Sequence, residues 1–210
     1  MPCLNRSDQI DFPTKKRTGK DACVTNIEYM ELIGKKVRLR EKLLSDAHDD
    51  FEWQRDPELA HFDGIAPTKL IFEQYLENYK RDMRYFKSPS RHVFGIETFE
   101  GLHIGNTAFY DIDEDLRETE LGILIGNREY WNKGYGAETV CLLADYIFQK
   151  TRLRRIHLKT LEENKRAQAS FKKCGFVPYV TMQTDGFAYV LMELTYRAWL
   201  KRQSEKEAET

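Results

Sequence analysis

Residues 120–137, ELGILIGNREYWNKGYGA, decide the fold. Positions 121–125 alternate with period two, which is typical of a strand with a buried face. Residues 127–133 are polar and basic, so the chain leaves the sheet there. Gly134 and Gly136 then precede apolar residues at helical spacing, so a helix begins on the glycines. Because glycine lets backbone amides approach a ligand and a helix N-terminus favours an anion, this order predicts a phosphate site.

Two glycines at a strand-to-helix turn can instead serve tight packing, and the local pattern leaves this alternative open. Two common phosphate loops are excluded. A Walker A loop places Lys and then Ser or Thr after its last glycine, whereas Lys133 precedes Gly134. A dinucleotide-binding loop has a third Gly or Ala at the position that Thr139 occupies.

Residues 131–136, WNKGYG, resemble the pyrophosphate loop of the GNAT superfamily of N-acetyltransferases. That loop reads Arg or Gln, two residues, Gly, one residue, then Gly or Ala, and Trp131 departs from it at the first position. The wording YWNKGYGAE is most similar to the branch of ribosomal-protein N-terminal acetyltransferases and spermidine acetyltransferases. The resemblance implies acetyl-CoA as the co-substrate.

A second motif, at residues 163–176, matches the family's Asn, helix, aromatic-x-Lys-x-Gly-Phe pattern. On its own, Asn164 is typical of a helix N-cap. The resemblance implies that its side chain also contacts the pantetheine arm, which capping does not exclude. At Phe171, relatives commonly have Tyr.

The resemblance implies an α+β fold: a single GNAT-type domain whose mixed, mostly antiparallel, twisted sheet has about seven strands, with helices on both faces. The residue patterns agree, and Asp185-Gly186 predicts the turn of a final hairpin. We expect Ser45 to cap a first helix that ends before Pro57, and Thr68 to cap a second. Strand patterns occupy residues 36–40, 92–98, 102–112, 120–125, 155–161, 177–184 and 187–195.

The expected N-acetyltransferase domain covers residues 30–200. Residues 1–29 are polar and basic with few apolar side chains, so we expect a mobile extension. A contact with ribosomes or anionic surfaces is the alternative to a solvated segment. Residues 201–210 have the composition of a charged tail.

The net charge of the 210-residue chain is −1, which argues against a nucleic-acid partner. No apolar run approaches the roughly 20 residues of a membrane span, and the N-terminus lacks a signal peptide, so we expect a cytoplasmic protein. Cys3, Cys23, Cys141 and Cys174 lack zinc-binding spacing, so we expect no metal site. In the cytoplasm they would be reduced thiols, with Cys141 and Cys174 packed in the core.

The implied reaction requires a base, because an amine with a pKa of about 10.4 must lose a proton before it attacks a thioester. We predict that Glu120 is this catalytic base, acting through water, because it opens the central strand. An ordinary charge at a strand end is the alternative. His92, His103 and Glu97 are weaker candidates.

The reaction also requires stabilisation of an oxyanion and of the leaving thiolate. In the family, backbone amides of the central strand bind the oxyanion, which implies residues 123–125 here. Phe171 cannot act as the acid that Tyr supplies in relatives. Water or another hydroxyl, such as that of Tyr179, is the alternative. The cofactor-binding residues expected from the resemblance are Ile123, Leu124, Ile125, Trp131, Asn132, Lys133, Gly134, Tyr135, Gly136, Ala137, Asn164 and Phe171.

The acceptor is less well defined than the cofactor. In the family, the first strand and the two helices that follow it wall the acceptor pocket. The acidic residues 111–120 predict either a lip that attracts a cationic amine or a solvated hairpin turn. Trp53, Phe62 and Phe86 are candidates for the pocket wall or for the core.

We therefore predict an N-acetyltransferase that moves an acetyl group from acetyl-CoA directly to a primary amine. The amine acceptor is a peptide, such as a protein N-terminus, or a small molecule of polyamine type. Acetylation of an amino sugar or antibiotic, and a non-catalytic CoA-binding regulatory module, are the alternatives. A homodimer stays open.

Overall fold

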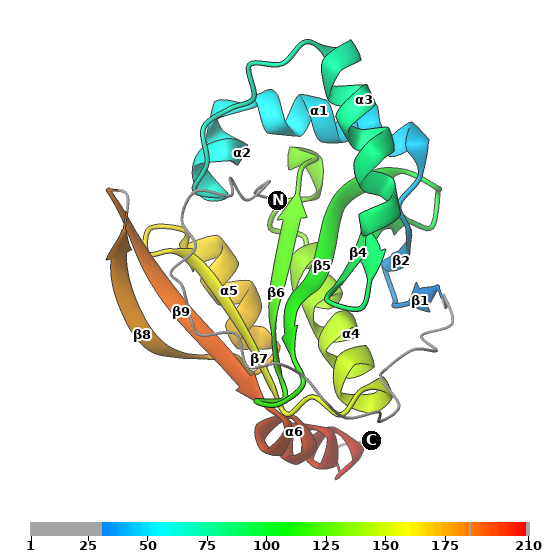
Figure 1. Cartoon of the computed structure of the whole chain (residues 1–210). Helices are drawn as coiled ribbons and strands as arrows, with labels where there is room; N and C mark the ends of the chain where they lie inside the picture. Colours follow the sequence, from blue (N-terminus) through cyan, green and yellow to red (C-terminus); the bar gives the residue numbers. More distant parts are fainter. Residues whose placement is uncertain (1–30, 185, 209–210) are drawn as a thin grey trace, which may run out of the picture.

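A nine-stranded sheet runs through the computed structural model, which describes residues 31–184 and 186–208 (Figure 1). Eight strands follow the order β1-β2-β4-β5-β6-β7-β9-β8, and β3 pairs with β4. Neighbouring strands are antiparallel except β6 and β7. The strands are β1 (Leu32–Ile33), β2 (Val37–Glu41), β3 (Lys87–Ser88), β4 (Arg91–Thr98), β5 (His103–Asp113), β6 (Glu118–Ile125), β7 (Arg155–Leu161), β8 (Val177–Thr184) and β9 (Phe187–Thr195).

The α+β prediction is confirmed, and all seven predicted strands are present. The two additional strands, β1 and β3, have two residues each, which is too short for a period-two pattern. Residues 1–29, expected as a mobile extension, and Asp185 of the predicted turn lie outside the described residues. The helices are α1 (Ala47–Arg55), α2 (Pro57–Phe62), α3 (Phe72–Asp82), α4 (Tyr135–Lys150), α5 (Lys165–Lys173) and α6 (Tyr196–Ala208), with short 3₁₀ turns at Leu44–Asp46, Met83–Tyr85 and Arg128–Tyr130.

The parallel pair β6 and β7 forms a fork. The two strands pair at Glu118, Thr119 and Glu120, opposite residues 155–157. Past this point they diverge, so the C-terminal half of β6 keeps β5 as its neighbour on one side and faces a gap on the other (Figure 1). Glu120 is the last paired residue and therefore lies at the base of the fork.

The main core lies between the sheet and α4. Val140, Leu143 and Ile147 on the apolar stripe of α4 are completely buried. They pack with Phe109 and Leu121, which are opposite each other in the β5–β6 register. Burial of side chains of this size stabilises the fold by about 1.5–3 kcal/mol each, which anchors the N-terminus of α4 beside the fork.

The opposite face of the sheet is covered by α1, and here the contact is polar. Lys42 donates to Asn106 Oδ1 at 2.5 Å and pairs with Asp50 at 2.8 Å. Asn106 in turn donates to Asp50 Oδ1 at 2.6 Å. Beyond this network, Phe51 of α1 packs on Tyr75 of α3 in a small second core. Helices therefore lie on both faces, as predicted.

Two predicted helix caps are wrong. Asp46, not Ser45, is the N-cap of α1, because a 3₁₀ turn precedes the helix. Thr68 caps no helix, since α3 begins at Phe72, and its hydroxyl accepts from the N–H of Leu70 at 3.3 Å. The additional helix α2 begins at Pro57, where Asp56 caps it by accepting from two backbone amides.

For Cys141 and Cys174 the prediction of core packing is confirmed, but the prediction of reduced thiols is wrong. Cys141 of α4 and Cys174, which follows α5, form a disulfide with a Cα–Cα distance of 5.2 Å. The two residues are distant in sequence, and only the packing of α5 on α4 brings them together. The charged segment after residue 200 continues α6, in which Trp199 donates to Asp145 of α4 at 2.6 Å.

The described helices include none that is both long and apolar enough to cross a membrane.

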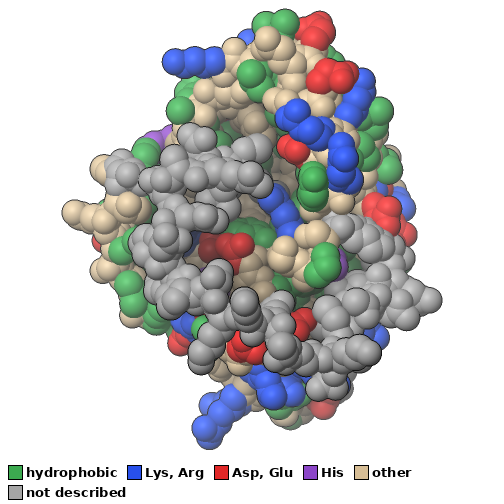
Figure 2. Space-filling model, viewed as in Figure 1, with side chains coloured by type: hydrophobic (Ala, Val, Ile, Leu, Met, Phe, Trp, Pro, Cys, Tyr) green, Lys and Arg blue, Asp and Glu red, His purple; other side chains and the backbone are tan. Residues whose placement is uncertain are grey.

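Around α3, Lys and Arg side chains lie among Asp and Glu side chains (Figure 2). Charges of both signs are therefore mixed on this part of the surface.

Candidate active site

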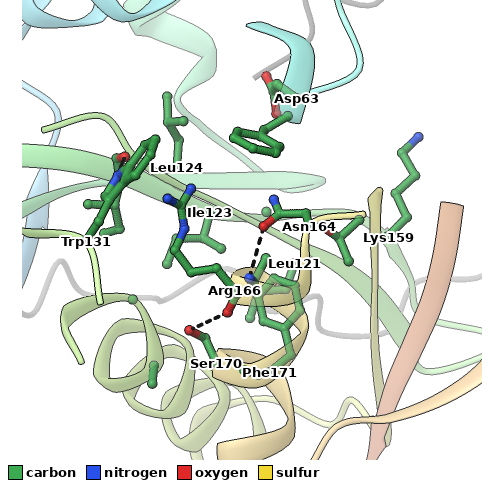
Figure 3. Close-up of a pocket in the computed structure, with 18 of the residues that line it drawn as sticks. Asp63, Leu121, Ile123, Leu124, Trp131, Lys159, Asn164, Arg166, Ser170 and Phe171 are labelled. Atoms are coloured by element: carbon green, nitrogen blue, oxygen red, sulfur yellow. Dashed lines mark hydrogen bonds between the residues drawn. The ribbon is translucent and has the colours of Figure 1, made fainter. Parts of the chain in front are cut away.

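A cleft of about 280 Å³ opens where β6 and β7 diverge. Residues from β6, the loop before α4, α4, α5 and α2 line it (Figure 3). The predicted site residues in its wall are Glu120, Ile123, Leu124, Ile125, Trp131, Asn132, Gly134, Gly136, Ala137, Asn164 and Phe171. The fold thus brings the two sequence motifs to one cavity.

Two predicted residues, Lys133 and Tyr135, do not line the cleft. The Lys133 carbonyl accepts from Lys36 Nζ at 2.9 Å, and the Tyr135 ring packs edge-on against Tyr130. Both alternate with Gly134 and Gly136, which do line the cleft.

The glycines differ in what they require. Gly134, the N-cap of α4, has a φ of 87°, a left-handed conformation that favours glycine. At Gly136 an added Cβ would meet Ile125 Cγ1 at 3.6 Å, which is ordinary contact. Tight packing therefore does not demand a glycine at 136, and a larger side chain would project toward the cleft. The open N-terminus of α4 fits a bound phosphate.

Trp131 lines the cleft and is hydrogen-bonded to the free edge of β6. Its indole Nε1 donates to the Ile125 carbonyl at 2.7 Å, so the backbone groups of Ile125 face away from β5. Because alternate residues of a strand direct their backbone groups to opposite edges, Ile123 also faces the gap and Leu124 faces β5. The amides available to a ligand are thus those of Ile123 and Ile125.

The N-terminal turn of α5 forms the wall opposite β6. Asn164 Oδ1 accepts from the Ala167 N–H at 3.1 Å, so the predicted N-cap is confirmed. The side chain still borders the cleft (Figure 3). Phe171, on the next turns of α5, is 5 % exposed and packs against Phe176.

Glu120 is the acid at the base of the fork. The Tyr110 hydroxyl donates to Glu120 Oε1 at 2.9 Å, and His157 Nε2 lies 3.9 Å from Oε2. Burial raises the pKa of Tyr110, and the negative charge of Glu120 raises it further. The hydroxyl therefore stays protonated and acts as a donor to the carboxylate. Glu120 is the third residue of β6 rather than its first.

Phe62 and Asp63 of the α2 segment also line the cleft, with Lys159 of β7 and Tyr189 of β9. The Phe62 ring lies 6.5 Å from that of Trp131. The carboxylates of Asp63 and Asp111 also raise the pKa of Tyr110, which places negative charge near that hydroxyl. Of the predicted acceptor-pocket aromatic residues, Phe62 lines the cleft.

The other candidates have structural positions outside the cleft. His92 stacks on Phe109 at 4.7 Å, and His103 pairs with Asp49 at 3.0 Å. Glu97 pairs with Arg40 at 2.8 Å. The remaining rings pack elsewhere: Trp53 against the backbone of Gly126, Phe86 against Tyr79, and Tyr179 beneath Arg155.

Sequence reasoning missed several residues of the wall, namely Asp63, Tyr110, Lys159, Arg166 and Tyr189. Four of them come from segments without a motif. Arg166 is different, because it lies two residues after Asn164 within the second motif. Its position in the sequence could therefore have indicated a place in the cleft wall.

The sheet is forked at its parallel pair, and the glycine-capped N-terminus of α4 lies at the fork. This is the arrangement that the resemblance to acetyl-CoA-dependent transferases implies. Residues 36–177 match the family described as "Acetyltransferase (GNAT) domain". The chain belongs to the GNAT acetyltransferases.

Three similar proteins show how far this likeness extends. A curated relative, "Uncharacterized N-acetyltransferase p20" of Bacillus licheniformis, is 28% identical over 134 residues, which cover 63% of this chain and 74% of the relative. Spermidine N-acetyltransferase from Vibrio cholerae, solved with CoA and spermine, has a TM-score of 0.68 at 20% identity, covering 78% of this chain and 98% of that one. Aminoglycoside acetyltransferase AAC(6′)-Ib, solved with coenzyme A, has a TM-score of 0.66 at 21% identity, covering 80% and 99%.

The protein is therefore an acyltransferase that depends on acetyl-CoA. The N-terminus of α4 fits the phosphates of such a co-substrate, and the free edge of β6 offers backbone amides to the rest of it. Because the family and the curated relative are acetyltransferases, the alternative of a non-catalytic CoA-binding module is not favoured.

Proposed function

We propose that this protein acetylates a primary amine, with Glu120 as the general base and with the cofactor held by residues 131–137 and Asn164. The observation that carries this proposal is the position of Glu120 at the base of the fork. Its carboxylate lies in the same cleft as Gly134, Gly136 and Asn164. A base, an anion site and a strand edge are thus within one cavity.

In the proposed reaction, Glu120 accepts, through water, a proton from the acceptor ammonium. The amine nitrogen then forms a bond to the acetyl carbonyl carbon, and the bond from that carbon to sulfur breaks. The amides of Ile123 and Ile125 stabilise the negative charge on the carbonyl oxygen. After the attack the nitrogen must lose a second proton. Because Phe171 supplies no proton, we propose that this second proton passes through water to the departing sulfur, so that CoA leaves as the thiol.

A cationic amine, such as a polyamine or a peptide N-terminus, is the acceptor class that we favour. Asp63 and Glu120 line the cleft, and the charge of Asp111 acts on Tyr110. Their negative charge attracts ammonium groups. An amino sugar or an aminoglycoside carries the same groups and is the second candidate.

Thiol release from acetyl-CoA with a panel of amines tests this proposal. Glu120→Gln should lower kcat by about 10²–10⁴-fold, because it removes the proton acceptor. Glu118→Gln is the matched control: Glu118 lies on the same strand but is paired with Arg155 at 2.7 Å. Equal activities of the Glu120→Gln variant and the wild type would remove Glu120 from the mechanism.

A homodimer and a cytoplasmic location are further proposals. The disulfide between Cys141 and Cys174 opposes the second, because thiols are kept reduced in the cytoplasm. Size-exclusion chromatography with light scattering measures the oligomeric state. Fractionation of cells measures the location.

A further inference from the structure

Arg166 extends from the first turn of α5 across the cleft and lies against Trp131 (Figure 3). Its Cζ atom is 3.4 Å from the centre of the Trp131 ring and 5.4 Å from that of Phe62. The Ser170 hydroxyl donates to the backbone carbonyl of Arg166, not to its side chain. Within residues 31–184 and 186–208, the guanidinium has ring contacts but no hydrogen bond or ion pair.

A second arginine near the same ring shows the contrast. Arg128 Cζ lies 5.4 Å from the centre of the Trp131 ring, but its guanidinium is paired with Asp56 and Glu58, each at 2.7 Å. Burial lowers the pKa of Arg166, the charge of Glu58 opposes this shift, and that of Arg128 adds to it. Glu58, whose charge acts on Arg166, is therefore already paired with Arg128.

A partly buried guanidinium without an anion is unfavourable, since it loses hydration and gains little in return. Stacking on Trp131 offsets part of this cost, by about 0.5–2 kcal/mol. A phosphate would offset more, because guanidinium and phosphate form paired, charge-assisted hydrogen bonds. The cleft that Arg166 enters also contains the glycine-capped N-terminus of α4, where a phosphate is favoured.

We infer that Arg166 binds the pyrophosphate of acetyl-CoA and that Trp131 holds the guanidinium ready for it. The indole is itself fixed by its bond to the Ile125 carbonyl at 2.7 Å. Trp131 stands where the family loop usually has Arg or Gln, so in this chain α5 supplies a cation to the loop. The inference depends on the co-substrate and not on Glu120 or the acceptor.

Isothermal titration of the full chain with CoA and with 3′-dephospho-CoA tests this inference. Arg166→Gln should weaken binding of both compounds by about 10–100-fold, because one charge-assisted contact is lost. Arg128→Gln is the matched control, since it removes a charge beside the same ring that is already paired. Its binding should stay within about threefold of wild type.

Three outcomes would overturn the inference. The first is unchanged binding in Arg166→Gln, and the second is an equal loss in Arg128→Gln. The third is a loss seen with CoA but not with 3′-dephospho-CoA, which would assign the contact to the 3′-phosphate.

A second variant guards against a general defect of Arg166→Gln. Arg166→Lys keeps the positive charge and should recover part of the lost affinity, whereas equal binding by Arg166→Lys and Arg166→Gln would contradict a phosphate contact. In turnover assays, Arg166→Gln should raise KM for acetyl-CoA with kcat unchanged at saturation. Failure of the Glu120 proposal would instead appear in kcat, so the two are distinguishable.

Discussion

Tyr110 and Glu120 are opposite each other in the β5–β6 register, so their side chains share one face of the sheet. The pairing fixes the orientation of the Glu120 side chain, because the Tyr110 hydroxyl donates to one of its carboxylate oxygens. The other oxygen faces His157, which follows from the parallel register of β6 and β7. At the scale of single residues, orientation by neighbours distinguishes Glu120 from an ordinary surface acid.

Tyr110→Phe should lower kcat by about tenfold, because the carboxylate loses a charge-assisted hydrogen bond. KM for acetyl-CoA should not change. Since the pKa of Tyr110 is raised, the hydroxyl is protonated throughout an assay from about pH 6 to pH 9, and the shape of the pH profile should be unaltered. Steady-state kinetics across this range measure both effects.

Tyr179→Phe is the control for that variant, because Tyr179 lies beneath Arg155 and away from the cleft. A pH limb that disappears in Tyr110→Phe would show that the hydroxyl itself titrates, contrary to this prediction.

Among the helices, α4 and α5 each carry one part of the proposed cofactor site. The first contributes the glycine-capped N-terminus, and the second contributes Asn164 and Arg166. The disulfide between Cys141 and Cys174 joins these two helices. Relative movement of the two parts of the site is therefore restricted.

Reduction of this disulfide should lower the free energy of unfolding by about 2–4 kcal/mol, because its loss frees a 33-residue span in the unfolded chain. Urea unfolding with and without a thiol-free reductant measures the difference. The double variant Cys141→Ser, Cys174→Ser should be insensitive to reductant. Identical wild-type midpoints under both conditions would show that the bond is absent or has no effect on stability.

At the scale of the whole molecule, a buried charge network joins the sheet to the segment that leads into α1. Arg40 of β2 pairs with Asp46 before α1 at 2.8 Å, and both side chains are largely buried. Burial alone would raise the pKa of Asp46, but the hydrogen bond from Arg40 and the charge of Lys42 lower it below its ordinary value. The charged form is therefore the one that the fold stabilises.

This shift predicts acid sensitivity with a definite sign. A lowered pKa in the folded state gives stability that is present above the ordinary pKa of about 3.9 and is lost as pH falls through the folded value. Asp46→Asn should cost about 3 kcal/mol at pH 7, because it removes a buried carboxylate from both Arg40, which keeps only Glu97, and Lys42.

Urea unfolding at pH 7 and at about pH 3 measures the effect. The gap between wild type and Asp46→Asn should narrow at the lower pH, where Asp46 begins to take up a proton. A gap that is constant with pH would show that the charge of Asp46 does not contribute.

Local patterns were sufficient to predict the long strands, the glycine-started helix α4 and the N-cap at Asn164. These features depend on neighbours within a few residues, through side-chain periodicity, backbone conformation and capping. The caps at Ser45 and Thr68 were wrong because both helices begin later in the chain: a 3₁₀ turn that includes Ser45 precedes α1, and α3 begins at Phe72. Asp46 also accepts a hydrogen bond from Arg40 of β2, a partner that the local sequence does not identify.

Residues 120–137 by themselves determined the strand, the turn and the helix N-terminus that suits a phosphate. Only the tertiary structure decided what surrounds them: the fork at Glu120, the pairing with Tyr110, the disulfide of Cys141 with Cys174, and Arg166 on Trp131. These contacts join residues that strand register and helix packing bring together from distant segments. Periodicity within one segment carries no information about which segment becomes its neighbour.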